Sequence, residues 1–265
     1  MHKLSLISKI FIATVVIAGA AVLGNGVLHW QSSKPVELLA LLVMTLIASR
    51  LKVKLPGISG TMSVNLPFLL IVAVRLSSSE SLLIAALASL VQSIPAVKSR
   101  TALVQALFNS ATITNAVAAA SLVFAFALHR GLVAPLSVAG AGAAFFLANT
   151  AQVALVLCLA EGKDLFKVWR EMARLSAPFY VLSAGVAAVI CAAIQFALWT
   201  EALALLPLMY SIYTSYRLYF ATSAAAEGLP AEAKPMGRAS ANAASAPRQS
   251  TEAGPGFSGQ RSSLV

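Results

Sequence analysis

Amide and hydroxyl side chains interrupt two long apolar stretches of the sequence. Four of them fall within about 120° of helical arc in the first stretch: Gln105, Asn109, Thr112 and Asn115. In the second stretch Asn149 and Gln152 are three residues apart and share a helical face, although Phe145 interrupts the polar stripe there. Such groups form either a pocket for a small uncharged or zwitterionic ligand or hydrogen bonds between helices. The interrupted stripe favours hydrogen bonds between helices.

Catalytic signatures are missing from the 265 residues. The sequence contains no H-E-x-x-H, no G-x-S-x-G, no phosphate-binding loop, no dinucleotide-binding glycine motif and no C-x-x-C. Cys158 and Cys191 lie inside apolar segments without metal-ligand spacing, and the three histidines fall near the ends of such segments. We therefore predict a protein that is not an enzyme and that holds neither a metal nor a cofactor.

The composition indicates a membrane protein. Hydrophobic residues make up 59% of the chain and charged residues only 11%, whereas soluble domains carry about 25% charged residues. The long apolar runs are typical of helices that lie in lipid. We expect an all-α polytopic bundle with eight membrane-embedded segments: 10–28, 36–51, 64–77, 80–96, 102–128, 132–160, 176–198 and 200–219.

Several of these segments are ambiguous. A full crossing needs about 20 apolar residues, so the second, third and fourth segments either span or re-enter the membrane. The stretch 54–67 contains two Gly and two Pro and should have irregular backbone. The first segment also has features of a signal peptide, but it remains apolar beyond the small residues at 19–21, which favours an uncleaved span.

A capping box is predicted at the start of the fourth segment. Ser77 and Glu80 have the S-x-x-E spacing in which each side chain accepts from the other residue's backbone N–H.

The positive charges indicate the orientation. With eight crossings, and before the tail is counted, twelve Lys and Arg residues lie on the side of the N-terminus and three on the other: Lys34, Arg75 and Arg130. Cytoplasmic loops carry the excess of Lys and Arg, so both termini should be cytoplasmic, in a cell inner membrane. The formal net charge of +10 is explained in this way, and we predict no binding to nucleic acid.

Residues 161–175 differ from the apolar segments. Leu165, Trp169 and Met172 share one helical face, and the cations line another: Lys163, Lys167, Arg170 and Arg174. This pattern predicts an amphipathic helix on the membrane surface, attracted by anionic lipid at the cytoplasmic face. Docking of a soluble partner is the alternative.

The composition changes near residue 221. Residues 221–265 are rich in Ala, Ser, Gly and Pro and cannot bury enough apolar surface to offset the entropy of ordering. We therefore expect a membrane domain at 1–220 and a disordered cytoplasmic tail at 221–265.

Five short motifs are similar to those of a known family: LFN at 107–109, FLANT at 146–150, VWRE at 168–171, LPL at 206–208 and YRLY at 216–219. They resemble the multi-pass N-terminal membrane module of bacterial HD-GYP and GGDEF signalling proteins. In that family the last helix continues into a cytoplasmic signalling domain, whereas here the tail follows. The resemblance implies a sensory or scaffolding module that works with a separate signalling protein.

Two functions remain open. The first is a membrane sensor or interaction module in which a stimulus changes the packing of segments 102–128 and 132–160. The second is a small-molecule permease or substrate-binding membrane component. The second requires a closed polar cavity lined by Asn109, Asn115, Asn149 or Gln152.

Overall fold

The structure is a computed structural model that describes residues 5–30, 32, 34–54, 61–63, 65–93 and 100–193, with positions 207, 210, 211, 214, 215 and 218. All of them belong to one of the two units of the chain, Met1–Leu229. The predicted tail at 221–265 lies outside the described residues. Of the predicted last span, 200–219, only the six isolated positions are described, and all six are helical.

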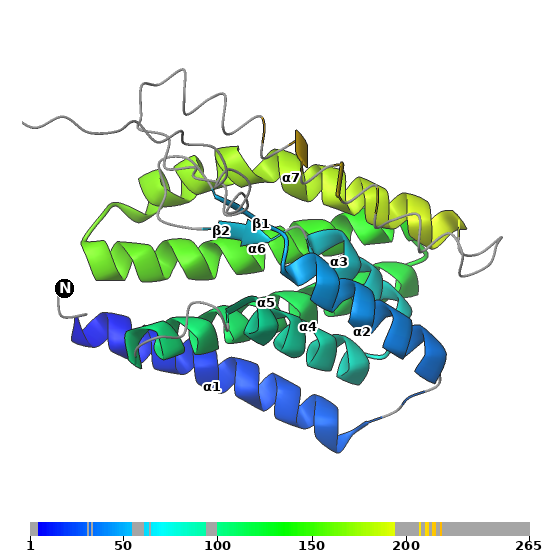
Figure 1. The fold of residues 1–265 in the computed structure, drawn as a ribbon, viewed down its shortest axis with the longest axis horizontal. Coiled ribbons are helices and arrows are strands. Elements are labelled where there is room, and N and C mark those ends of the chain that lie inside the picture. Colours follow the sequence, from blue (N-terminus) through cyan, green and yellow to red (C-terminus); the bar gives the residue numbers. More distant parts are fainter. Residues whose placement is uncertain are drawn as a thin grey trace, which may run out of the picture. The chain divides into compact units, whose positions relative to one another are not determined.

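The predicted helical class is confirmed (Figure 1). The described helices are α1 (Leu6–Leu28), α2 (Pro35–Ser49), α3 (Leu66–Arg75), α4 (Ser78–Ser93), α5 (Arg100–His129), α6 (Ala134–Glu161) and α7 (Leu165–Ala193). Two short strands, β1 (Lys52–Lys54) and β2 (Thr61–Ser63), pair antiparallel with Val53 opposite Met62. The stretch predicted to be irregular is therefore partly an ordered ribbon between α2 and α3.

The number of membrane crossings differs from the prediction. Among the described residues, four helices are long and apolar enough to cross a membrane: α1, α5, α6 and α7. The other three have 15, 10 and 16 residues, and at 1.5 Å per residue even the longest extends only about 24 Å. The hydrocarbon core is about 30 Å thick, so the prediction of eight spans is wrong.

The short helices nevertheless reverse the chain direction. Ser8 near the start of α1 donates to the Leu159 carbonyl near the end of α6 (2.7 Å), and Ser79 at the start of α4 donates to the His29 carbonyl after α1 (3.2 Å). We call the end where α1, α3, α5 and α7 start the basic end, and the other the far end. Described cations of the basic end are Lys9, Arg50, Lys52, Lys54, Arg100, Lys163, Lys167, Arg170 and Arg174, against Lys34, Arg75 and Arg130 at the far end.

Helix α3 forms the centre of the core. It is apolar on every face, which is typical of a helix surrounded by protein. The side chains from Leu66 to Ala73 are all buried, and Phe68, Leu70 and Val72 have no exposed surface. They pack in one cluster with residues of α2, α4, α5, α6 and α7. A helix that is too short to span is thus stabilised by burial among longer ones.

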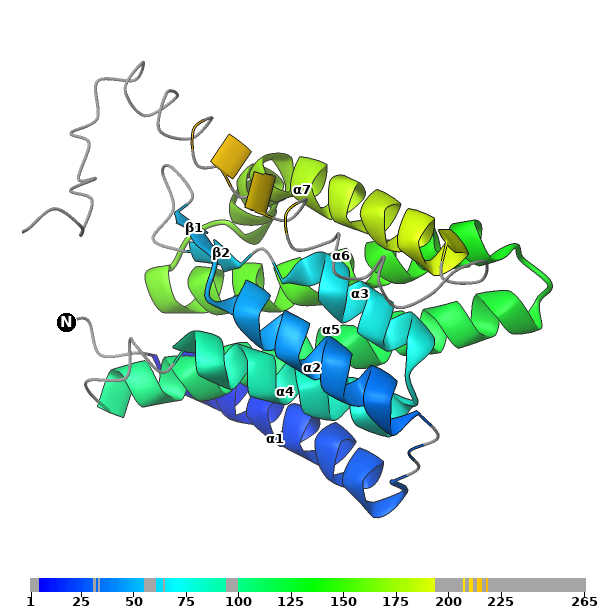
Figure 2. The same ribbon diagram turned by 45° about the vertical axis from the view of Figure 1, so that its right-hand side comes forward.

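The predicted surface helix at 161–175 is not a separate element. Helix α7 runs without interruption from Leu165 to Ala193, through Pro178. Trp169 donates its indole N–H to the Thr150 hydroxyl of α6 (3.2 Å), and Met172 is buried. Two of the three side chains of the apolar face assigned to lipid, Trp169 and Met172, therefore pack against protein, whereas Leu165 is exposed. In both views α7 lies beside α6, while α1 lies on the other side of α5 (Figures 1 and 2).

Small residues allow two close helix contacts. A Cβ atom added to Gly19 of α1 would lie 2.8 Å from the Cα atom of Ala111 in α5, and one added to Gly142 of α6 would lie 2.9 Å from the Cβ atom of Ala184 in α7. Gly24, on the same helix as Gly19, has no atom within 4 Å of its added Cβ.

We predict that Gly19→Ala destabilises the protein by about 1–3 kcal/mol, because the methyl group meets backbone that cannot turn away. The free energy of unfolding in detergent micelles, followed by circular dichroism, measures this loss. Gly24→Ala is the matched control and should leave stability unchanged or slightly increase it, since alanine favours helix. Equal effects of the two substitutions would contradict the close contact between α1 and α5.

Candidate functional site

One turn of α6, residues 149–152, connects this helix to two neighbours. Asn149 donates its side-chain amide to the Tyr180 hydroxyl of α7 (2.7 Å). The Gln152 carbonyl oxygen accepts from the Asn115 amide of α5 (3.3 Å), and Thr150 accepts from the Trp169 indole of α7. We call these three α6 residues with their partners the α6 clasp.

The α6 clasp extends to a fourth helix. Asn115 also approaches the backbone carbonyl of Val15 in α1 (3.4 Å), and Gln152 donates to the Ala148 carbonyl of its own helix (2.8 Å). The Thr150 hydroxyl donates to the Phe146 carbonyl (2.6 Å). The side-chain amides of Asn115, Asn149 and Gln152 thus form hydrogen bonds between helices.

The remaining predicted polar residues do not converge on the same place. Gln105 and Asn109 are exposed on α5. Thr112 is 1% exposed, and its hydroxyl has no hydrogen-bond partner among the described residues. Of the residues that the pocket hypothesis names, Asn109 is thus exposed, while Asn115, Asn149 and Gln152 make hydrogen bonds between helices.

Tyr180 is the main residue of the clasp that the sequence analysis missed. Its ring packs against Phe146 with centroids 4.9 Å apart and lies 6.1 Å from Phe145 and 6.3 Å from Phe179. These aromatic rings fix the position of the phenol, and Asn149 satisfies its hydroxyl. A tyrosine four residues after Ser176 on a continuous helix was the available signal, but the expected break after residue 175 concealed it.

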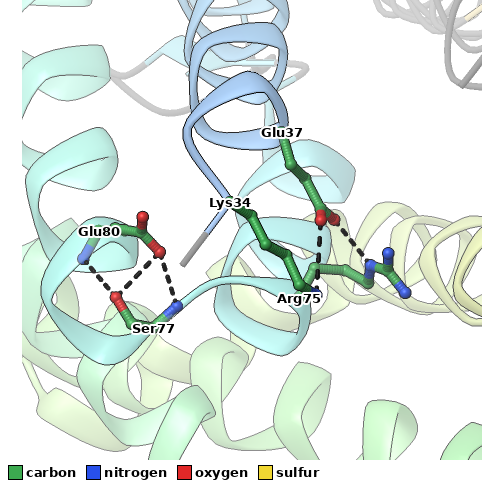
Figure 3. Close-up of polar contacts among 5 residues, drawn as sticks. All are labelled: Lys34, Glu37, Arg75, Ser77 and Glu80. Carbon is green, nitrogen blue, oxygen red and sulfur yellow. Dashed lines mark hydrogen bonds and ion pairs between the residues drawn. The ribbon is translucent and has the colours of Figure 1, made fainter. Parts of the chain in front are cut away.

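A second polar cluster lies at the far end of the bundle. The Arg75 guanidinium of α3 donates through Nε to Glu37 of α2 at 2.9 Å, and Lys34 lies 3.5 Å from the other carboxylate oxygen (Figure 3). The Glu37 side chain is only 4% exposed, against 22% for Arg75 and 49% for Lys34. This pair joins the start of α2 to the end of α3. The sequence analysis did not predict it.

The predicted capping box is confirmed at the start of α4 (Figure 3). Glu80 accepts from the Ser77 backbone N–H at 3.0 Å and from the Ser77 hydroxyl at 2.9 Å, and its own N–H lies 3.3 Å from that hydroxyl. Glu80 is 1% exposed, and its second oxygen has no partner among the described residues. The box fixes the turn between α3 and α4 directly beside the Glu37–Arg75 pair.

The cations predicted for a surface helix divide into two sets. Lys163 lies in the connection between α6 and α7, where its ammonium group is 2.6 Å from Glu161. The hydrogen bond and the charge of Glu161 raise the pKa of Lys163. Lys167, Arg170 and Arg174 are exposed on α7, and with Asp164, Phe166 and Glu171 they line a shallow hollow.

The chemistry available at these sites is hydrogen bonding and charge pairing. In the part of the chain that the structure describes, no three His, Cys, Asp or Glu side chains gather as metal ligands. Cys158 and Cys191 are free thiols on different helices.

The sequence of the chain matches one known protein family. The model of one family, MASE9, matches residues 2–220. The chain belongs to the MASE9 family. MASE domains are multi-pass membrane sensory modules, which agrees with the four apolar helices of spanning length. No curated protein and no solved structure matches the chain.

For this MASE9 chain, we predict that Arg75→Leu lowers the free energy of unfolding by about 3 kcal/mol, because it leaves Glu37 buried without its main partner. The double variant Glu37→Leu with Arg75→Leu should recover most of this loss, since no buried charge remains. Chemical or thermal unfolding of the purified protein measures both.

Lys34→Gln is the control for this experiment. The Lys34 side chain is 49% exposed, so removing its charge should change stability by less than about 1 kcal/mol. If Lys34→Gln and Arg75→Leu cost the same, the buried pair does not have the role assigned to it.

Proposed function

We propose that this protein is a sensory or interaction module without catalytic activity, in which a stimulus changes the packing of α5, α6 and α7. The observation that carries the proposal is the α6 clasp: within one turn of α6, three polar side chains bond residues of α5 and α7. The family membership supports the sensory class.

The proposed change in packing rests on the behaviour of polar side chains in lipid, which must bond either one protein partner or another. No water within the hydrocarbon region replaces a broken bond, so an amide that loses its partner must find another one. Thr112, one turn before Asn115 on α5, is a buried hydroxyl without a partner among the described residues. A shift of α5 that gives Thr112 an acceptor at the expense of the Asn115–Gln152 bond is the kind of two-state change that a sensor needs.

The distribution of Lys and Arg indicates the orientation in the membrane and the end of the bundle that would contact a signalling protein. The basic end should face the cytoplasm of a bacterium's inner membrane, because cytoplasmic segments carry the excess of Lys and Arg. The stimulus then acts within the bundle or at the far end, and the basic end reports to a cytoplasmic signalling protein. The absence of catalytic motifs from the sequence supports a protein with no activity and no cofactor of its own.

The permease alternative has no comparable support. Of the four residues named as possible lining of its closed cavity, Asn109 is exposed, and Asn115, Asn149 and Gln152 already have hydrogen-bond partners.

The experiment places a photoreactive amino acid at Lys163, which is exposed in the connection between α6 and α7 at the basic end. Crosslinking in cells that naturally express the chain should capture a cytoplasmic signalling protein. Asn149→Leu, which removes the bond to Tyr180, should change the yield of that crosslink at least severalfold without changing the amount of protein in the membrane.

Thr14→Ala is the matched control, because the Thr14 hydroxyl is exposed and bonds only the Ile10 carbonyl of its own helix. It should leave the crosslink unchanged. The proposal fails if no signalling protein is captured, or if Asn149→Leu and Thr14→Ala give the same yield as the original chain.

A further inference from the structure

Three cations form a stripe on the first turns of α7. Lys167, Arg170 and Arg174 fall within about 60° of helical arc, and all three are exposed. Two large apolar side chains at the very start of the helix are also exposed, Leu165 at 42% and Phe166 at 67%. The three cations line an open hollow together with Phe166, Asp164 and Glu171.

The opposite face of the same turns is occupied by protein. Trp169 bonds Thr150 of α6, and Met172 and Ser176 are buried. Helix α7 therefore cannot lie flat on the membrane with this face in lipid. The cationic stripe and the two apolar side chains remain available for another molecule, together with the exposed Asp164 and Glu171.

The length of α7 indicates the depth of the stripe. Its 29 residues extend about 43 Å, and the hydrocarbon core is about 30 Å thick within about 40–45 Å that includes the headgroups. An upright α7 centred in the bilayer therefore begins in the headgroup layer, with Lys167 within this layer and Arg174 about 6–8 Å below it. Long Lys and Arg side chains at such helix ends extend towards that layer.

We propose that Lys167, Arg170 and Arg174 bind the phosphodiester groups of anionic phospholipids from the side of an upright helix, with Phe166 and Leu165 against the upper part of the acyl chains. Guanidinium groups match phosphate oxygens in pairs of hydrogen bonds. Two acidic side chains, Asp164 and Glu171, line the same hollow, so three positive and two negative charges leave it a formal net charge of +1. The Asp164 carboxylate accepts from the Lys167 backbone N–H (2.7 Å).

A lipid fits this surface better than an acidic protein segment. Exposed aromatic and aliphatic side chains beside the cations match a molecule with a charged head and an apolar chain. The stripe also begins two residues from Trp169, so a bound headgroup would lie next to a contact of the α6 clasp.

The experiment uses the full purified chain in neutral detergent micelles. Dioleoylphosphatidylglycerol is titrated against dioleoylphosphatidylcholine, and bound lipid is counted by native mass spectrometry. The anionic lipid should bind more tightly than the zwitterionic one. Each cation replaced by Gln should weaken anionic binding about fivefold, and the triple variant about a hundredfold.

Arg130→Gln is the matched control, an exposed arginine at the far end that stacks on Phe126 (5.0 Å). It should leave anionic binding at these sites unchanged. If the triple variant does not fold, Arg170→Gln and Arg170→Lys are compared instead. Arg170→Lys keeps the charge but loses the paired hydrogen bonds, so its anionic binding should lie between that of the original chain and that of Arg170→Gln.

Three results would overturn the inference. They are equal binding of the two lipids, undiminished anionic binding by the triple variant or by Arg170→Gln, and full competition by a soluble acidic peptide at equimolar concentration. These results do not depend on whether a signalling partner exists, so the lipid site and the proposed function are tested separately.

Discussion

The absence of competing water within the bilayer gives the α6 clasp its importance. In a water-soluble protein, water could replace the hydrogen bonds of Asn149, Thr150 and Gln152. In lipid no water replaces them, so these bonds determine which face of α6 packs against α5 and α7. Such bonds contribute only about 0.6 kcal/mol each on average. Their effect is to select one packing of apolar helices over others of similar energy, and a sensor depends on that selection.

The rest of the bundle stabilises the helices that surround the α6 clasp. The buried helix α3 packs against longer helices, and the Glu37–Arg75 pair with the Ser77–Glu80 box fixes its far end. Because α2, α3 and α4 still reverse the chain direction, the described cations remain concentrated at one end although only four described helices are of spanning length. The far end is thus held by charge pairs, whereas the basic end has the exposed cations Lys167, Arg170 and Arg174.

Sequence reasoning predicted the local features well. Seven of the expected segments correspond to helices, and the Ser77–Glu80 box is present because its signal is contained within four residues. It also favoured interhelical bonds for Asn115 and Gln152, because two amides on neighbouring apolar helices have few other partners. The exposure of Gln105 and Asn109 was not predictable, since it depends on which helices cover that part of α5.

The errors came from interactions between distant residues. Glu37 and Arg75 are 38 positions apart, and only the antiparallel packing of α2 and α3 joins them. The continuity of α7 did have a signal: buried positions follow at three and four residues through Met172, Ser176, Tyr180, Ser183 and Ala187. The change from charged to apolar composition at residue 175 suggested two separate helices. The buried positions, however, follow at helical intervals across residue 175, as in one continuous helix.

The central claim is that the α6 clasp sets the packing of α6 against α7. Nitroxide labels at the exposed positions Leu147 of α6 and Val181 of α7 report this packing through electron–electron double resonance, once Cys158 and Cys191 are replaced by Ala. Tyr180→Phe removes the hydroxyl that Asn149 contacts and keeps the aromatic ring. We predict one narrow distance distribution for the parent protein and a broadened or two-component distribution for Tyr180→Phe. Identical distributions would contradict the claim.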